Sequence, residues 1–62
     1  MKKGEESRQR LIECAAELFS KNGYSATGIS EILKQTGLPK GSFYFYFKSK
    51  DDLATAVTEY YQ

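Results

Sequence analysis

Hydrophobic residues in the first third of the chain recur at steps of three and four, the spacing of one face of an α-helix. The residues on this face are Leu11, Ile12, Ala15, Leu18 and Phe19. The pattern predicts a helix over about residues 5–21. Gly23 follows this segment and is suited to end the helix, because glycine readily adopts the left-handed conformation that is common there.

Two shorter helices are predicted next, joined by a tight turn. The first runs over about 28–35 with Thr27 as its N-cap, because a threonine hydroxyl can accept a hydrogen bond from a free N–H of the first turn. Gly37 is suited to end this helix. Pro39 then fixes φ at a value that fits the first turn of a helix over about 39–47.

A fourth helix is predicted over about 50–61. Ser49 is a good N-cap, and Asp52 three residues later completes a short capping box. The apolar face of this helix is expected to consist of Leu53, Val57 and either Tyr60 or Tyr61. The chain is therefore predicted to be all-α.

The segment Phe43-Tyr44-Phe45-Tyr46-Phe47 is ambiguous, because five consecutive aromatic residues have a strand propensity. A single strand among helices has no partner for its backbone hydrogen bonds, which favours a helix instead. In a helix, Phe43 and Phe47 share one face at i and i+4 and point into the core. Tyr44 and Phe45 then point elsewhere, and this surplus of aromatic side chains indicates a binding function.

Length and composition limit that function. Sixty-two residues form one small domain with a marginal core, and 40% hydrophobic with 27% charged residues is typical of a globular chain. The sequence has no histidine and one cysteine, so it lacks the commonest general base, the commonest metal ligand and any internal disulfide. No apolar run approaches the length of a membrane span. We therefore expect a cytoplasmic, non-catalytic binding module without a metal or membrane partner.

The charges are unevenly distributed, although the formal net charge is only +1. Residues 32–50 contain four lysines and no acidic residue, a charge of +4. Residues 51–62 contain three acidic residues and no basic one, a charge of −3. A basic stretch of this kind favours a polyanionic partner, although an uneven solvated surface gives the same pattern.

Two short helices joined by the turn Gly37-Leu38-Pro39 form a helix-turn-helix, whose second helix can enter the major groove of DNA. In its residues the chain resembles the N-terminal DNA-binding domain of the TetR/AcrR family of bacterial transcriptional regulators. The most specific part of the match is the string KGSFYFYFKSK over residues 40–50. The other matching residues are Arg8, Ile12, Ala15, Ala16, Leu18, Phe19, Gly23, Tyr24, Ala26, Thr27, Ile29, Ile32, Gly37 and Leu53.

The resemblance implies a three-helix helix-turn-helix bundle of the homeodomain-like type, followed by the start or body of a fourth helix. The third helix is then the recognition helix, with Lys40, Gly41 and Ser42 near base edges. Tyr44 corresponds to the family tyrosine whose hydroxyl reaches a backbone phosphate. Tyr46 stands where many relatives carry a histidine with the same role.

The resemblance also implies DNA contacts at two other helix starts. Thr27, Gly28 and Ser30 open the second helix, where the family contacts phosphates and sometimes bases. Lys48 and Lys50 flank the start of the fourth helix, where free N–H groups and positive charge favour a phosphate.

Two positions bear on sequence readout. Phe45 either contacts a thymine methyl group or covers the bundle. Ser30 stands where some relatives place an arginine against guanine, so that contact is missing and the operator sequence is not predicted.

The resemblance further implies a homodimer that binds a double-stranded DNA operator at the nucleoid, responds to a small-molecule effector and acts as a repressor. The effector-binding and dimerisation domain is C-terminal in the family and is expected to be absent from this chain, so no cofactor is expected in this domain. The alternative interpretation is a small helical protein-interaction module with an aromatic binding face. Salt distinguishes the two, because lysine–phosphate contacts weaken steeply with ionic strength and an aromatic interface does not.

Overall fold

The computed structural model describes the backbone of residues 3–61 and the side chains of residues 6–61. This part of the chain forms four helices and no strand: α1 (Lys3–Asn22), α2 (Ile29–Thr36), α3 (Lys40–Tyr46) and α4 (Lys50–Tyr60). The predicted all-α class is thereby confirmed, and each helix begins and ends within two residues of its predicted bounds.

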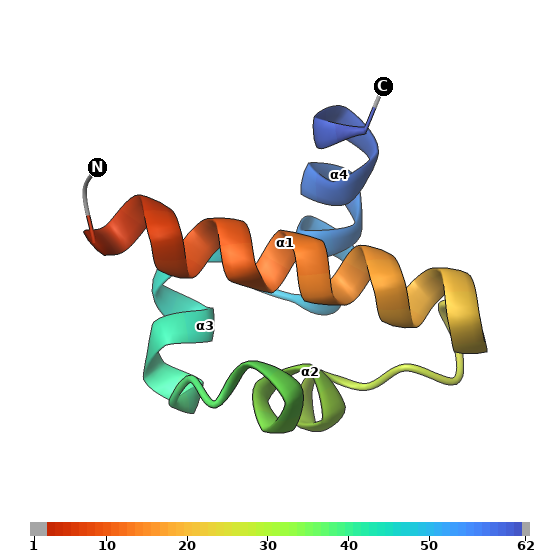
Figure 1. Ribbon diagram of the computed structural model, residues 1–62, viewed down its shortest axis with the longest axis horizontal. Coiled ribbons are helices and arrows are strands. Elements are labelled where there is room, and N and C mark those ends of the chain that lie inside the picture. Colours follow the sequence, from red (N-terminus) through yellow and green to blue (C-terminus); the bar gives the residue numbers. More distant parts are fainter. Residues whose placement is uncertain (1–2, 62) are drawn as a thin grey trace.

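The long helix α1 organises the molecule, because each of the other three helices packs against it. Figure 1 shows α2 and α3 on one side of α1, whereas α4 starts behind α1 and rises past its other side. The core between them consists of Leu11, Ile12, Ala15, Leu18, Ile32, Phe43, Phe47, Leu53 and Ala56. The helical face predicted for α1 is buried as expected, except that Phe19 at its end is only half-buried.

The prediction for the apolar face of α4 was partly wrong. Leu53 is fully buried, and Ala56 joins it in the core. Tyr60 and Tyr61 are about half exposed, at 51% and 56%. The reason is the direction of α4, whose last turn extends beyond α1 and meets no facing helix there (Figure 1).

Both glycine helix ends have the predicted left-handed conformation. Gly23 has φ +91°, and its N–H donates to the Phe19 carbonyl at 2.9 Å. Gly37 has φ +73°, and its N–H donates to the Leu33 carbonyl at 2.8 Å. These bonds satisfy carbonyl groups that have no partner within the last helical turn.

The start of α4 is capped by side chains. The Ser49 hydroxyl accepts a hydrogen bond from the Asp52 N–H at 3.2 Å, as predicted. The Asp52 carboxylate accepts in return from the N–H of Lys48, one residue before the cap, at 3.1 Å. The two bonds hold the loop between α3 and α4 against the first turn of α4.

The starts of α2 and α3 differ from the prediction. Gly28, not Thr27, is the N-cap of α2, and it makes no side-chain bond. Thr27 is fully buried, and its hydroxyl donates to the Gly23 carbonyl at 2.9 Å, with the Leu18 carbonyl at 3.2 Å. The hydroxyl therefore faces carbonyl groups of α1 and of the loop that follows it, and does not reach the first N–H groups of α2. Pro39 is likewise the N-cap of α3 and not part of its first turn.

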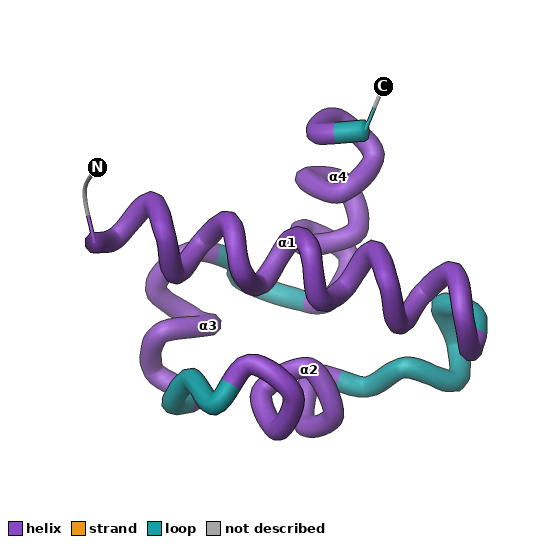
Figure 2. Tube along the Cα trace, in the orientation of Figure 1, coloured by secondary structure: helices purple, strands orange, loops and turns teal. Residues whose placement is uncertain are grey.

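The aromatic segment is helical as far as Tyr46, and Figure 2 shows only helix and loop along the described part of the chain. Phe47 leaves the helix in an extended conformation, at φ −134° and ψ 133°. Phe43 and Phe47 are nevertheless both buried, with their ring centroids 5.9 Å apart. Their predicted role in the core is confirmed, and the strand interpretation is excluded.

Candidate nucleic-acid interface

Helix α3 has one buried face and one exposed face. Lys40, Gly41, Tyr44 and Phe45 are all exposed and follow one another at the spacing of a single helical face. The exposed fraction is 47% for Tyr44 and 80% for Phe45, compared with 0% for Phe43, which directly precedes them in the sequence. We call these four residues the outer face of α3. It presents an ammonium group, a phenol hydroxyl and an apolar ring to solvent.

The aromatic rings of this region support one another. The Tyr44 ring meets Phe43 edge-on at 5.1 Å, and the Phe45 ring meets Tyr46 edge-on at 4.9 Å. Tyr46 is half-buried against the core, and Ser42 is half-buried as well. Edge-to-face pairs of this kind favour a defined ring orientation. The exposed rings therefore have fixed neighbours on the protein side.

Gly41 is not required by the fold. A Cβ atom at this position would meet nothing within 4 Å, and the backbone does not have a positive φ. Glycine within a helix costs about 0.5–1 kcal/mol relative to alanine. Since no contact with the described residues explains this glycine, a close approach by another molecule does so best.

The start of α2 is also open to solvent. Gly28 and Ser30 are both exposed, and no side chain caps the first turn of this helix. The free N–H groups and the helix dipole favour an anion there. The exposed backbone at Gly28 can therefore donate a hydrogen bond to an anion, whereas the buried hydroxyl of Thr27 cannot.

The two lysines near the start of α4 differ in their surroundings. Lys48 is exposed. Lys50 is half-buried, and its ammonium donates to the carbonyl groups of Tyr24 at 2.8 Å and Thr27 at 2.7 Å. The same ammonium lies over the Tyr24 ring, 4.2 Å from its centroid. Of the residues predicted to contact DNA, Thr27 and Lys50 are thus the two whose side chains donate hydrogen bonds to carbonyl groups of the protein itself.

Tyr24 contacts the start of α4, and sequence reasoning did not predict this contact. Its hydroxyl hydrogen-bonds to the Asp51 carboxylate, and its ring lies 5.2 Å from that of Phe19. The bond to Asp51 raises the pKa of Tyr24, because deprotonation would remove the donor and bring two negative charges together. No periodic signal in the sequence connects residue 24, in the loop after α1, with residues 50 and 51 at the start of α4.

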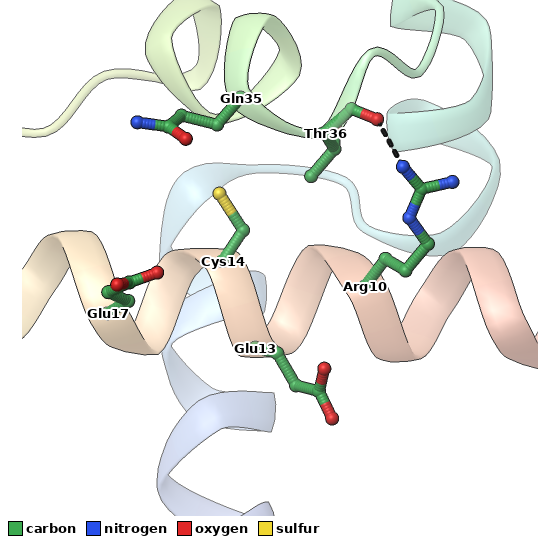
Figure 3. Close-up of a pocket in the computed structure, with 6 residues that line it drawn as sticks. All are labelled: Arg10, Glu13, Cys14, Glu17, Gln35 and Thr36. Atoms are coloured by element: carbon green, nitrogen blue, oxygen red, sulfur yellow. Dashed lines mark hydrogen bonds between the residues drawn. The ribbon is translucent and has the colours of Figure 1, made fainter.

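A shallow polar groove runs between α1 and α2 (Figure 3). Its lining residues are Arg10, Glu13, Cys14, Glu17, Gln35 and Thr36. Arg10 closes one end by donating to the Thr36 carbonyl at 2.6 Å, which places a cation at the C-terminus of α2. This capping role was also missed by sequence reasoning.

Cys14 reaches from α1 toward α2 in the same groove, where its thiol lies 3.9 Å from the Ile32 carbonyl. Burial raises the pKa of this thiol, and the nearby carboxylates of Glu17 and Glu31 raise it further. The group therefore stays protonated near neutral pH and is a poor nucleophile.

Two features are absent from the described residues, a membrane-spanning helix and a cluster of metal ligands. No helix there has the length and apolar character needed to cross a membrane. Nor do the side chains of residues 6–61 form a cluster of potential ligands for a metal ion.

The bundle, the turn at Gly37 and the exposed outer face of α3 define a helix-turn-helix domain. Residues 11–57 match the family described as "Bacterial regulatory proteins, tetR family". The chain belongs to the TetR family, whose members are DNA-binding transcriptional regulators. The predicted resemblance is confirmed.

Individual relatives agree with this assignment. The chain is 45% identical over 56 residues to the helix-turn-helix transcriptional regulator YerO of Bacillus subtilis, covering 90% of this chain and 19% of YerO. It is 46% identical over 55 residues to the transcriptional regulator AcuR of Cereibacter sphaeroides, covering 89% of this chain and 25% of AcuR. The crystal structure of reduced Escherichia coli NemR superposes with a TM-score of 0.88 at 38% identity, covering 90% of this chain and 29% of NemR. The chain thus spans less than a third of each of these proteins.

Proposed function

We propose that this chain binds double-stranded DNA with the outer face of α3 in the major groove. The observation that carries the proposal is the division of α3 into a buried face and an outer face whose exposed residues do not contribute to the core. Lys40, Gly41 and Ser42 at the start of α3 approach base edges. Tyr44, Tyr46 and Lys48 contact phosphates, which fix the position of the protein on the duplex.

The start of α2 supplies further phosphate contacts in this proposal, through the backbone at Gly28 and the hydroxyl of Ser30. Phe45 lies against a thymine methyl group, because an 80% exposed ring covers little of the bundle. The side chain of Thr27 takes no part, since it is fully buried.

The proposal extends to the whole regulator. Family membership supports a homodimer that binds a pseudo-palindromic operator, with one recognition helix in each half-site. We propose that the regulator is controlled by a small-molecule effector bound outside residues 1–62, so that this domain needs no cofactor, and that it acts as a repressor at the nucleoid in the cytoplasm. One relative, NemR of Escherichia coli, is named as a transcriptional repressor. The role proposed for this chain is non-catalytic.

Salt dependence tests the DNA-binding proposal. We expect the chain to bind a short duplex at low salt and to lose most of its affinity by physiological ionic strength, because log K falls by about 0.9 per phosphate contact and unit log salt. Fluorescence anisotropy with a labelled duplex measures this. An affinity unchanged over that range would support the aromatic protein-interaction module instead.

A second test concerns Tyr44. The Tyr44→Phe variant is expected to weaken binding by a similar factor on duplexes of unrelated sequence, because a phosphate contact carries no sequence information. Tyr61→Phe is the matched control, since its ring is also half exposed but lies at the end of α4. A loss confined to one duplex sequence would show that Tyr44 contacts bases.

A further inference from the structure

The loop of residues 23–28, which joins α1 to α2, is fastened on its α1 side by a buried side chain. The Thr27 hydroxyl donates to the Gly23 carbonyl at 2.9 Å and lies 3.2 Å from the Leu18 carbonyl, a second acceptor for the same proton. The Thr27 N–H donates to the Tyr24 carbonyl at 3.2 Å. The loop therefore has a defined backbone conformation, and its two carbonyls at Tyr24 and Thr27 are available to a donor from outside the loop.

That donor comes from α4. The Lys50 ammonium reaches both carbonyls, at 2.8 and 2.7 Å, and lies 4.2 Å from the centroid of the Tyr24 ring. Next to it, Asp51 accepts a hydrogen bond from the Tyr24 hydroxyl. Two consecutive residues of the first turn of α4 thus hold opposite ends of the Tyr24 residue, its backbone and its phenol group.

These contacts use most of the hydrogen-bonding capacity of the lysine ammonium group. An ammonium group has three N–H donors, and two are directed to carbonyls while the charge faces an aromatic ring. Hydrogen bonds from a charged donor are about twice as strong as neutral ones. A phosphate contact by Lys50 would require the ammonium to leave this arrangement, whereas exposed Lys48 has no such cost.

We propose that Lys50 is a positioning residue, which with Tyr24 and Asp51 clamps the start of α2 to the start of α4, and that it is not a phosphate contact. The clamp acts next to the proposed interface, because the Thr27 carbonyl directly precedes Gly28, the N-cap of α2. A displacement of α4 therefore moves the first turn of α2 with it. The DNA readout of this inference rests on the proposed function, but the clamp itself can be tested without DNA.

The first experiment compares two lysines on DNA. Lys50→Met removes the ammonium and keeps the aliphatic stem, and Lys48→Met is the matched control two residues away. The probe is a mixed-sequence duplex of about 20 base pairs, which covers about two helical turns. We expect Lys48→Met to lower the slope of log K against log salt by about 0.9, and Lys50→Met to weaken binding about threefold to tenfold while leaving that slope unchanged.

The second experiment measures hydrogen exchange in the free protein. The reporters are the amides of Thr27 and Ile32, which donate to the Tyr24 and Gly28 carbonyls, and the reference is the amide of Phe47 in the bond that ends α3. In Lys50→Met, the ratio of reporter to reference exchange is expected to rise about threefold to tenfold, since a local contact to the loop is lost. Lys48→Met is expected to leave the ratio unchanged.

Tyr24→Leu makes the test independent of any change in charge. This variant removes the ring and the phenol and leaves both lysines in place, so it is expected to raise the same exchange ratio and to weaken binding at an unchanged salt slope. It also decides the question if Lys50→Met does not fold. Lys50→Arg keeps a charged donor near both carbonyls and is expected to restore most of the protection.

The results distinguish failure of the clamp from failure of the proposed function. A slope that falls as much in Lys50→Met as in Lys48→Met, or an exchange ratio unchanged in both Lys50→Met and Tyr24→Leu, would overturn the clamp. Absence of duplex binding by the unmodified chain would count against the proposed function, and the exchange ratio would still decide whether Lys50 holds the loop.

Discussion

The two faces of α3 show how one seven-residue helix serves both folding and binding. Phe43 and Phe45 are the same residue type two positions apart, yet one is fully buried and the other is 80% exposed. Phe43 packs in the core beside Phe47, whereas Phe45 has Tyr46 as its edge-on partner and otherwise faces solvent. Aromatic content alone is therefore a poor guide to burial in this segment, and the position of each ring around the helix decides its role.

The largest expected effect concerns the buried face. Phe43→Ala should reduce the free energy of unfolding by about 3–5 kcal/mol, through lost burial and the cavity left behind. A domain of this size has little stability in reserve, so the variant is expected to be largely unfolded. Urea titration followed by far-ultraviolet circular dichroism measures this. A cooperative transition whose free energy of unfolding is lower by less than about 1 kcal/mol would show that the buried face of α3 is not essential to the fold.

Gly41→Ala sharpens the comparison, because its effects on stability and binding should have opposite signs. We expect the free energy of unfolding to rise by about 0.5 kcal/mol, the lower end of the glycine-to-alanine range given above, since Gly41 lies in the first turn. Duplex binding should weaken about tenfold, because the added methyl group overlaps a closely approaching surface. Denaturation and anisotropy on the same sample measure both. Improved stability with unchanged binding would exclude close contact with DNA at Gly41.

The smallest expected effect on stability belongs to Phe45→Ala, which should change the free energy of unfolding by no more than about 0.5 kcal/mol. Its effect on DNA binding tests the proposed contact with thymine. The unmodified chain should bind a thymine duplex better than the same duplex with uracil in place of thymine, and the variant should not distinguish them. An equal preference in both proteins would show that Phe45 contacts no thymine methyl group.

Much of the fold was predictable because the signals are local. Steps of three and four residues in α1, the left-handed glycine at Gly37, and the serine–aspartate pair at Ser49 and Asp52 each depend on neighbours within one or two helical turns. The helical interpretation of the aromatic run also followed, because a strand there has no pairing partner. The family followed from a specific residue string over 40–50, which the comparison over 11–57 confirmed.

The candidate site was predictable only in part. The exposed positions of Lys40, Tyr44 and Phe45 follow from the helical spacing of their buried neighbours. The bonds that Lys50 makes within the protein do not, because its carbonyl partners lie on the loop between α1 and α2, far from it in the sequence. The burial of Thr27 also depends on packing, since one acceptor of its hydroxyl is the Leu18 carbonyl of α1. A lysine near a helix start has the same local sequence whether its ammonium binds a phosphate or a carbonyl.

The sequence by itself therefore determined the four helices to within two residues of their ends, the apolar stripe of α1, and which family the chain resembles, since each depends on residues close together along the chain. Only the tertiary structure decided which polar groups remain free. Crossing α1 against three other helices brings Tyr24 next to Lys50 and Asp51 and leaves Tyr60 and Tyr61 in solvent. A hydrogen bond or a buried ring depends on what lies opposite, and the packing of the helices determines this.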